Sequence, residues 1–288
     1  RRAPRAALAA LLFACAVLAK PTTVVLPVLL LIWAATRGRA RASLPAVVPL
    51  VLIALGGVAL QVWMGRQHGV VRGEVFSGID HRMLQMARVF PRYLLNLVFP
   101  TGLSARYDWG GFGSGFDRAT LAALCSCSAY AAMAFLSVRS APRLCLGLAW
   151  VFVALLPVAQ IVPTGLYMAD KYMHIPSIGA CLLFGLAVGE FTSARAWVAG
   201  LLIATFGALT WARCEEWRDT RTLLADAMAR SPRSVDANYY LARTYKDAGD
   251  LDRAERALRR TQAIDPSYFG TYYTLGKIEL ERGRPFEA

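Results

Sequence analysis

The sequence predicts an all-α protein in two parts, a polytopic helical membrane domain followed by a solenoid of paired helices. Hydrophobic residues make up 56% of the chain and the mean hydropathy is +0.41, whereas soluble domains are usually about 45–50% apolar. Long apolar runs recur through the first part of the chain, and a repeated pattern of small residues, glycine and proline fills the second. The first part therefore needs lipid as its solvent.

Five apolar runs are long enough to cross a hydrocarbon core about 30 Å thick, which takes about 20 helical residues. They lie at roughly 44–64, 119–137, 144–162, 174–191 and 196–212. The stretch 7–35 differs because Lys20 and Pro21 divide it into two shorter apolar pieces, which form either one kinked helix or a re-entrant pair. Residues 1–213 make up the predicted membrane domain.

The charges separate the two parts and predict the orientation. Residues 1–213 carry 19 Lys+Arg and 6 Asp+Glu, and the remaining residues carry 13 of each. A basic excess among apolar spans orients membrane proteins, so we expect no nucleic-acid binding. The short loops that we place in the cytoplasm contain Arg37, Arg39, Arg41, Arg139, Arg143 and Arg195. Parity then places the connection 65–118, the loop 163–173 and everything after 212 on the non-cytoplasmic side.

The long connection contains an amphipathic segment. Its apolar residues recur at helical spacing: Met83, Met86, Phe90, Leu94 and Leu97. Its polar residues fall on the other side: Arg82, Gln85, Arg92 and Asn96. This pattern predicts a helix in the membrane interface, which Pro91 kinks or divides. The glycine-rich segment 107–113 is either a flexible connector or a sugar-binding loop.

The six cysteines show no spacing typical of a metal site. They fall in or beside apolar runs, where small buried side chains are expected. We therefore predict no metal cofactor.

The tail repeats at an interval of 34 residues. The matching pairs are Tyr239 and Tyr273, Leu241 and Leu275, Ala242 and Gly276, Gly249 and Gly283, Ala254 and Ala288, and Pro232 and Pro266. This is the period of tetratricopeptide repeats (TPRs), with small residues between paired helices, glycine at the turn and proline after the second helix. The predicted packing residues are Leu241, Ala242, Tyr245, Gly249, Ala254, Pro266, Leu275, Gly276, Gly283 and Ala288.

The repeat region divides into a degenerate half repeat at 214–232, a repeat at 235–268 and a partial repeat at 269–288. Because stacked repeats need neighbours to bury their faces, we expect further repeats to follow in a longer protein.

Three segments, taken with this tail, resemble the TMTC-type (transmembrane and tetratricopeptide-repeat-containing) protein O-mannosyltransferases. The first is residues 19–27, AKPTTVVLP, and the second is residues 93–100, YLLNLVFP, with Leu103 and Ser104 beyond it. The third, residues 168–179, MADKYMHIPSIG, is similar to the family's Ala-Asp/Glu-Arg-Tyr-x-Tyr-Leu-Pro-x-x-Gly. Here Lys171 replaces the arginine and His174 a tyrosine, so the charge is kept without bidentate geometry.

The resemblance implies a GT-C-type membrane glycosyltransferase, present here as a fragment. Such an enzyme moves a mannose-like sugar from a polyprenyl (dolichyl-type) phosphate to protein Ser/Thr on the non-cytoplasmic side. Its general base is a carboxylate in the first outer loop, and we expect this chain to begin after that loop, so its catalytic residues are unknown. The implied partners are the bilayer, the lipid-linked sugar and a polypeptide bound to the TPRs. Composition favours a bacterial inner membrane over the endoplasmic reticulum.

The residues predicted to bind the donor phosphate are Lys20, Arg92, Asp170, Lys171, Tyr172 and His174. Each has a structural alternative. Lys20 either binds the donor or extends to the interface, and Asp170 and Lys171 either serve the site or form a local ion pair. His174 either shuttles protons or is structural.

Two outer carboxylates, Asp80 and Asp108, are in-chain substitutes for the missing base or simply solvated. Glu190 faces a neighbouring helix or the interface. Two other functions stay open, a non-catalytic membrane-anchored TPR scaffold and a ligase or flippase for lipid-linked glycans.

Overall fold

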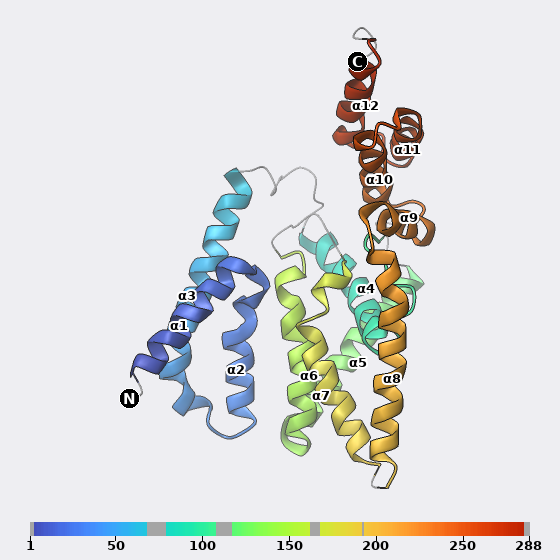
Figure 1. The fold of residues 1–288 in the computed structure, drawn as a ribbon. Coiled ribbons are helices and arrows are strands. Elements are labelled where there is room, and N and C mark those ends of the chain that lie inside the picture. Colours follow the sequence, from blue (N-terminus) through green and yellow to red (C-terminus); the bar gives the residue numbers. More distant parts are fainter. Residues whose placement is uncertain (1–2, 68–78, 108–116, 162–167, 192, 285–288) are drawn as a thin grey trace. The chain divides into compact units, whose positions relative to one another are not determined.

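A computed structural model describes residues 3–67, 79–107, 117–161, 168–191 and 193–284, and all regular structure in these ranges is helical (Figure 1). The predicted all-α class is therefore confirmed. The chain forms two compact units. The membrane unit contains Arg1–Phe99, Ser114–Tyr167 and Lys171–Val198, and the repeat unit contains Pro100–Gly113, Met168–Asp170 and Ala199–Ala288.

The membrane unit begins with two helices separated at Lys20. Helix α1 (Ala3–Ala19) is followed by a 3-10 turn, Pro21–Val25, and by α2 (Leu26–Ala35). Lys20 itself is extended, with φ −147° and ψ 103°, because a proline disfavours the helical conformation of the residue before it. Both α1 and α2 pack against α3 (Ala40–Gln67). The stretch 7–35 thus forms two helices.

Within the described residues, three helical segments are long and apolar enough to cross a membrane: α3, α5 (Arg118–Ser140) and the segment Arg195–Trp217 that contains α8 (Arg195–Cys214). Helices α6 (Pro142–Leu155) and α7 (Pro176–Gly189) are shorter. The predicted span 144–162 is helical only to Leu155, beyond which a 3-10 turn runs over Leu156–Val158. The number of membrane crossings stays a prediction.

Helices α6 and α7 approach each other closely at two glycines. A Cβ atom added at Gly179 would lie 2.8 Å from the carbonyl oxygen of Gly147, and one added at Gly147 would lie 2.6 Å from a methyl carbon of Leu183. Small residues allow such close contacts between membrane helices. Trp150 of α6 also donates a hydrogen bond from Nε1 to the carbonyl of Ile175, at 3.0 Å. These contacts fix the start of α7.

Helix α4 (Ile79–Val98) occupies the predicted amphipathic segment, and Pro91 does not divide it. Its polar residues Gln85, Arg88 and Asn96 are buried. The Arg88 guanidinium donates to Thr120 Oγ1 at 2.8 Å and to Asp117 Oδ1 at 2.9 Å. Arg88 thus packs against the start of α5, and not every polar residue of this helix is exposed.

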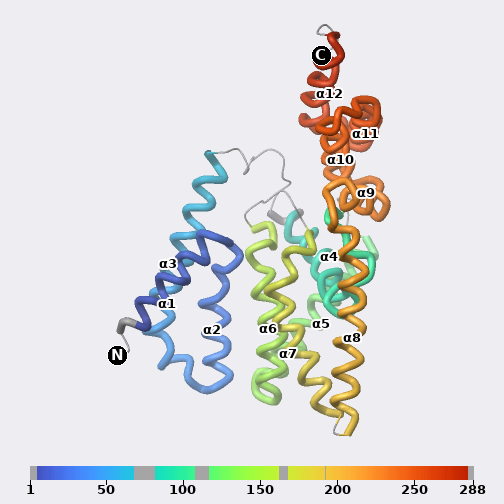
Figure 2. Tube along the Cα trace, in the orientation of Figure 1, coloured from blue at the N-terminus to red at the C-terminus, as the bar shows by residue number. Residues whose placement is uncertain are grey.

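The repeat unit contains α9 (Thr220–Arg230), α10 (Val235–Asp247), α11 (Leu251–Ile264) and α12 (Phe269–Glu281), whose succession Figure 2 traces. Side chains of Asp219, Ser234 and Asp250 cap the N-termini of α9, α10 and α11. Gly249 and Gly283 follow α10 and α12 at φ +79° and +76°, a conformation that favours glycine.

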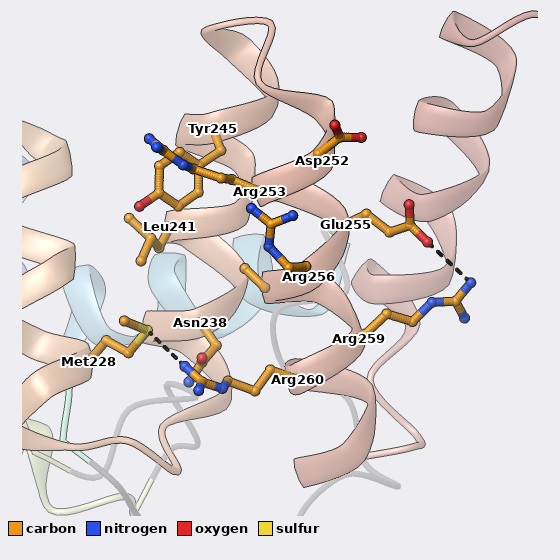
Figure 3. Close-up of a pocket in the computed structure, with 11 residues that line it drawn as sticks. Met228, Asn238, Leu241, Tyr245, Asp252, Arg253, Glu255, Arg256, Arg259 and Arg260 are labelled. Carbon is orange, nitrogen blue, oxygen red and sulfur yellow. Dashed lines mark hydrogen bonds and ion pairs between the residues drawn. The ribbon is translucent and has the colours of Figure 1, made fainter.

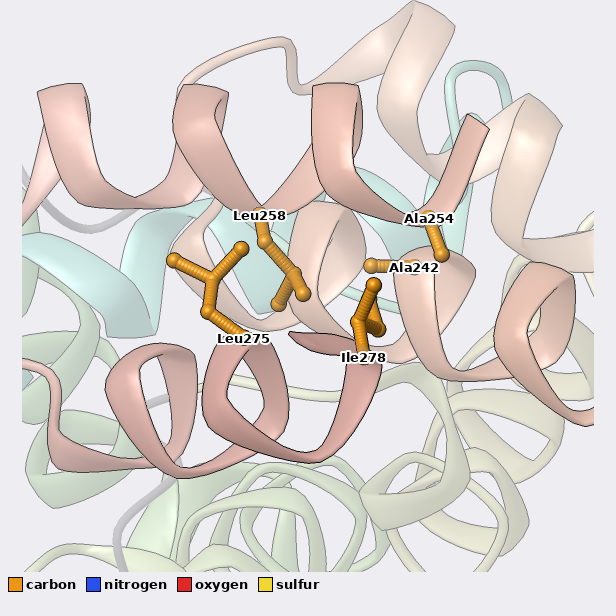
Figure 4. Close-up of a cluster of buried hydrophobic side chains, with 5 residues drawn as sticks. All are labelled: Ala242, Ala254, Leu258, Leu275 and Ile278. Carbon is orange, nitrogen blue, oxygen red and sulfur yellow. The ribbon is translucent and has the colours of Figure 1, made fainter. Parts of the chain in front are cut away.

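The core of the repeats lies between α10, α11 and α12 (Figure 4). It consists of Ala242, Ala254, Leu258, Leu275 and Ile278. Ala242 and Ala254 have no exposed surface, so small side chains lie where the paired helices meet. Leu241 is also buried, Tyr245 and Gly276 are half-buried, and Ala288 lies outside the described residues.

Candidate functional site

The first and third motifs meet inside the membrane unit. The Lys20 ammonium lies 2.8 Å from His174 Nε2, although 154 positions separate the two residues. His174 Nδ1 lies 2.8 Å from the carbonyl oxygen of Lys171. The same ammonium lies 3.2 Å from His174 Nδ1, so the tautomer decides which ring nitrogen accepts from Lys20.

This arrangement leaves donors available for an anion. An ammonium group has three N–H donors and Lys20 uses one on His174, so two remain. The Lys171 ammonium lies 5.5 Å from the ring centroid of Tyr172. No carboxylate pairs with either lysine in the part of this unit that the structure describes. We call Lys20, Lys171 and His174 the cation cluster.

Local structure holds both sides of the cation cluster. The Lys20 carbonyl accepts hydrogen bonds from the amide and the hydroxyl of Thr23, at 3.0 and 2.8 Å, which close the 3-10 turn. On the other side Ser177 Oγ donates to the His174 carbonyl at 2.8 Å. The helix break and the start of α7 thus set the two side chains.

Within the repeat unit, Asp170 of the third motif contacts the loop that follows the second motif. Tyr107 donates from its hydroxyl to Asp170 Oδ1 at 2.5 Å, and the Ser104 amide donates to the same hydroxyl at 3.3 Å. Burial raises the pKa of Asp170, against the lowering effects of the Tyr107 hydrogen bond and of the Arg213 and Arg230 charges. Asp170 is therefore a half-buried carboxyl that holds this loop.

A second contact joins the same loop to the first complete repeat. Arg106 pairs with Asp236 of α10 at 3.1 Å, and its guanidinium lies 4.7 Å from the ring centroid of Tyr240. Burial raises the pKa of Asp236, which the Arg106 charge opposes. The loop is thereby fixed to the repeats by an ion pair as well as a hydrogen bond.

Arg213 and Arg230 belong to an ionic network at the start of the repeats. Both pair with Glu216 and with Asp226, and the Asp226 contacts are 3.0 Å from Arg213 and 2.7 Å from Arg230. The network connects the end of α8 to α9.

The six predicted donor residues are distributed as follows. Lys20, Lys171 and His174 form the cation cluster, and Tyr172 lies beside the Lys171 ammonium. Asp170 contacts Tyr107 instead. Arg92 is exposed on α4 and makes no ion pair with the residues that the structure describes.

The three other carboxylates considered in the sequence take no part in the cation cluster of the described structure. Asp108 and the side chain of Asp80 are outside the described residues, and Glu190 is exposed at the end of α7. Among the residues described, no group of three or more His, Cys, Asp or Glu is placed to hold a metal ion, and all six cysteines are free.

Sequence reasoning missed the roles of Arg106 and Tyr107. Tyr107 begins a glycine-rich segment that has no periodicity, so no local pattern marks its side chain. The available signal was its position directly after the second motif.

Comparisons with known proteins agree with these features. Residues 215–287 match the family model described as "Tetratricopeptide repeat". Protein O-mannosyl-transferase Tmtc1 of Drosophila melanogaster is 28% identical over 141 residues, which are 45% of this chain and 16% of that protein. Protein O-mannosyl-transferase Tmtc2 of the same organism is 26% identical over 143 residues, 47% of this chain and 15% of that protein. No solved structure matches the chain significantly.

The aligned segment spans less than a fifth of each relative, and nothing in these matches supports the expected bacterial source. The TMTC-type proteins are nevertheless the group that both the motifs and the comparisons indicate. The chain is therefore similar to the TMTC-type proteins, and its residues 215–287 match the tetratricopeptide repeat.

Proposed function

We propose that this protein is a membrane glycosyltransferase that moves a mannose-like sugar from a polyprenyl phosphate to Ser or Thr side chains of a protein on the non-cytoplasmic side. The observation that supports it most is the contact between Lys20 and His174, because it joins two segments that resemble the same family of enzymes. The relatives matched here are named protein O-mannosyl-transferases.

The cation cluster suits the phosphate of such a donor. Two N–H groups of Lys20 and the ammonium of Lys171 can donate to phosphate oxygens, and lysine binds phosphate as a point charge. A cation beside apolar membrane helices is costly unless it has a partner, and an anionic head group supplies one. His174 then orients the Lys20 ammonium through its ring.

The proposed roles of the other predicted residues differ. A carboxylate repels a phosphate, so we assign Asp170 to holding Tyr107 and its loop rather than to donor binding. Tyr172 supports the Lys171 ammonium through its ring. Arg92 remains a further cation available to the donor from α4.

The TPRs are proposed to bind the polypeptide acceptor, since stacked helix pairs form grooves for extended chains. The same match favours a second candidate, a membrane-anchored TPR scaffold without catalysis. In that case the cation cluster serves only to join α7 to the break between α1 and α2.

A sugar-transfer assay distinguishes the glycosyltransferase from the scaffold. Membranes that contain the whole protein are supplied with a radiolabelled polyprenyl-phosphate sugar and candidate acceptors, and transfer is compared between wild type, Lys20→Ala and Lys171→Ala. Loss of a charge-assisted hydrogen bond predicts at least about a tenfold fall in transfer. Arg139→Ala, which removes an exposed cation at the end of α5, is the matched control and should keep wild-type transfer. Absence of transfer by the wild type with every donor favours the scaffold.

A further inference from the structure

The repeat unit carries a recessed groove formed by α9, α10 and α11 (Figure 3). Its volume is about 740 Å³, within the range of about 300–1,000 Å³ typical of ligand sites. Met228 lies on the α9 side, Leu241 and Tyr245 come from α10, and several arginines come from α11. The groove therefore combines an apolar floor with cationic walls.

The charges in this groove do not cancel. Its two acidic residues, Asp252 and Glu255, are each bound at 2.6 Å by Arg282, which directly follows α12. Arg256 and Arg260 have no carboxylate partner among the described residues. Arg260 donates a hydrogen bond to the sulfur of Met228, at 3.9 Å, as the dashed line in Figure 3 marks. Two arginines are thus free to pair with an anion.

The floor of the groove offers an aromatic ring above buried polar packing. The Tyr245 ring has the Arg221 guanidinium 5.2 Å from its centroid and that of Arg253 at 5.9 Å. Asn238 is fully buried, and its Nδ2 donates to the backbone carbonyls of Pro232 and Ser234. Its Oδ1 has no hydrogen-bond partner and is buried from solvent. A ligand with apolar parts as well as carboxylates would match the exposed lining.

The spacing of the arginines indicates an extended chain. Arg256 and Arg260 are four residues apart on α11, a rise of about 6 Å. Residues two apart in an extended peptide lie on the same side, about 6.7 Å from each other. Arginine also binds carboxylates in a bidentate manner. We propose that this groove binds an extended acidic peptide whose carboxylates occupy alternate positions.

A peptide fits the groove better than an anionic membrane surface does. The groove lies between three helices, and its partly exposed Met228 and Tyr245 lie where a planar array of head groups would not reach. Peptide binding in this groove would be the acceptor-binding step of the proposed function, and only the identification of the peptide as an acceptor rests on that function. Binding is measured without any sugar donor, so its failure is distinct from a failure of transfer.

The test uses the whole protein in detergent and a fluorescent peptide of about ten residues in which Glu alternates with Ser. Fluorescence anisotropy should show that this peptide binds. A peptide with Gln in place of each Glu should not bind, and a peptide with its glutamates in one block should bind more weakly. The double variant Arg256→Gln, Arg260→Gln should bind at least about tenfold more weakly. Arg243→Gln removes an exposed arginine of α10 that does not line the groove, and it should bind normally.

The comparison of the Glu and Gln peptides on the wild type needs no variant, so a misfolded double variant leaves the test intact. Equal binding of the two peptides, or no binding of either, overturns the proposal. The proposal is also overturned if the protein binds phosphatidylserine vesicles through Arg256 and Arg260 but does not bind the peptide. That result would indicate a membrane contact. Intact sugar transfer without peptide binding refutes this inference alone.

Discussion

The membrane unit and the repeat unit place their side chains in opposite ways. In α5 of the membrane unit, Phe135 and Leu136 are 77% and 72% exposed, while Arg88 of the neighbouring α4 is buried. In the repeat unit, Leu258 and Ile278 have no exposed surface. Both units are built from α-helices.

The difference lies in what holds helices together in each solvent. Water drives apolar side chains of the repeats into a common core. Lipid is as apolar as leucine and supplies no such force, so membrane helices depend on close packing of small residues and on hydrogen bonds. Gly147 with Gly179, and Arg88 with Thr120, are the corresponding contacts here. Four predictions test this contrast, from the largest expected effect to the smallest.

Leu258→Ala should destabilise the repeat unit most. It removes a side chain from the centre of the core, at a cost of about 2–5 kcal/mol. Hydrogen exchange of the α10–α12 amides in the whole protein should accelerate accordingly. Phe135→Ala removes a larger but lipid-facing side chain and should leave exchange in α5 nearly unchanged. Similar losses from both variants would contradict the contrast.

Gly179→Ala should destabilise the membrane unit by about 1–3 kcal/mol, because the added methyl group meets the backbone of Gly147. Gly185→Ala provides the matched control, since no atom lies within 4 Å of the added Cβ in the same helix. Unfolding of the protein in mixed micelles with increasing sodium dodecyl sulfate measures both. If the two variants unfold together, the close crossing of α6 and α7 contributes nothing.

Arg88→Leu should cost about 1 kcal/mol, the net value of a hydrogen bond to the buried Thr120 hydroxyl. A larger effect is not expected, because the other partner, Asp117, is more than half exposed. The same unfolding titration applies, with Arg139→Leu as an exposed control. If Arg88→Leu were more stable than wild type, the hydrogen bond to Thr120 would contribute less than an apolar side chain at this position.

The smallest effect is a pH dependence in the repeat unit. Burial raises the pKa of Asp170, so the folded protein holds this proton more tightly than the unfolded chain does. The contribution of Asp170 thus favours folding at acidic pH and is lost as pH rises through its folded pKa. Asp170→Asn should therefore gain stability relative to wild type between about pH 4 and neutrality.

Glu255 has a pKa shift in the opposite direction, and thermal unfolding at a series of pH values tests both residues. Hydrogen bonds from Arg282 lower its pKa, so its contribution is present above the unfolded pKa and is lost as pH falls through the folded one. Thermal unfolding of Glu255→Gln should approach that of wild type on acidification. Parallel pH profiles for the two variants would contradict these assignments.

Local patterns were sufficient to predict many elements of the fold. The break at Lys20 follows from Pro21, the turns after α10 and α12 follow from Gly249 and Gly283, and the matching pairs indicated the tetratricopeptide repeats. Each rests on the conformational limits of one residue or on spacing within a helix, and such properties are encoded by residues close together in the chain.

The tertiary structure alone decided which of these residues meet. Lys20 and His174 are 154 positions apart, and nothing near either residue specifies the other. Periodicity could assign Gln85 and Asn96 to the polar side of a helix, but it could not show that these two side chains are buried. Likewise, the sequence of α11 alone indicates only a solvated face of arginines, and the structure shows that α9 and α10 form a groove beside them. Contacts between distant segments depend on how complete helices pack, and that is a property of the whole fold.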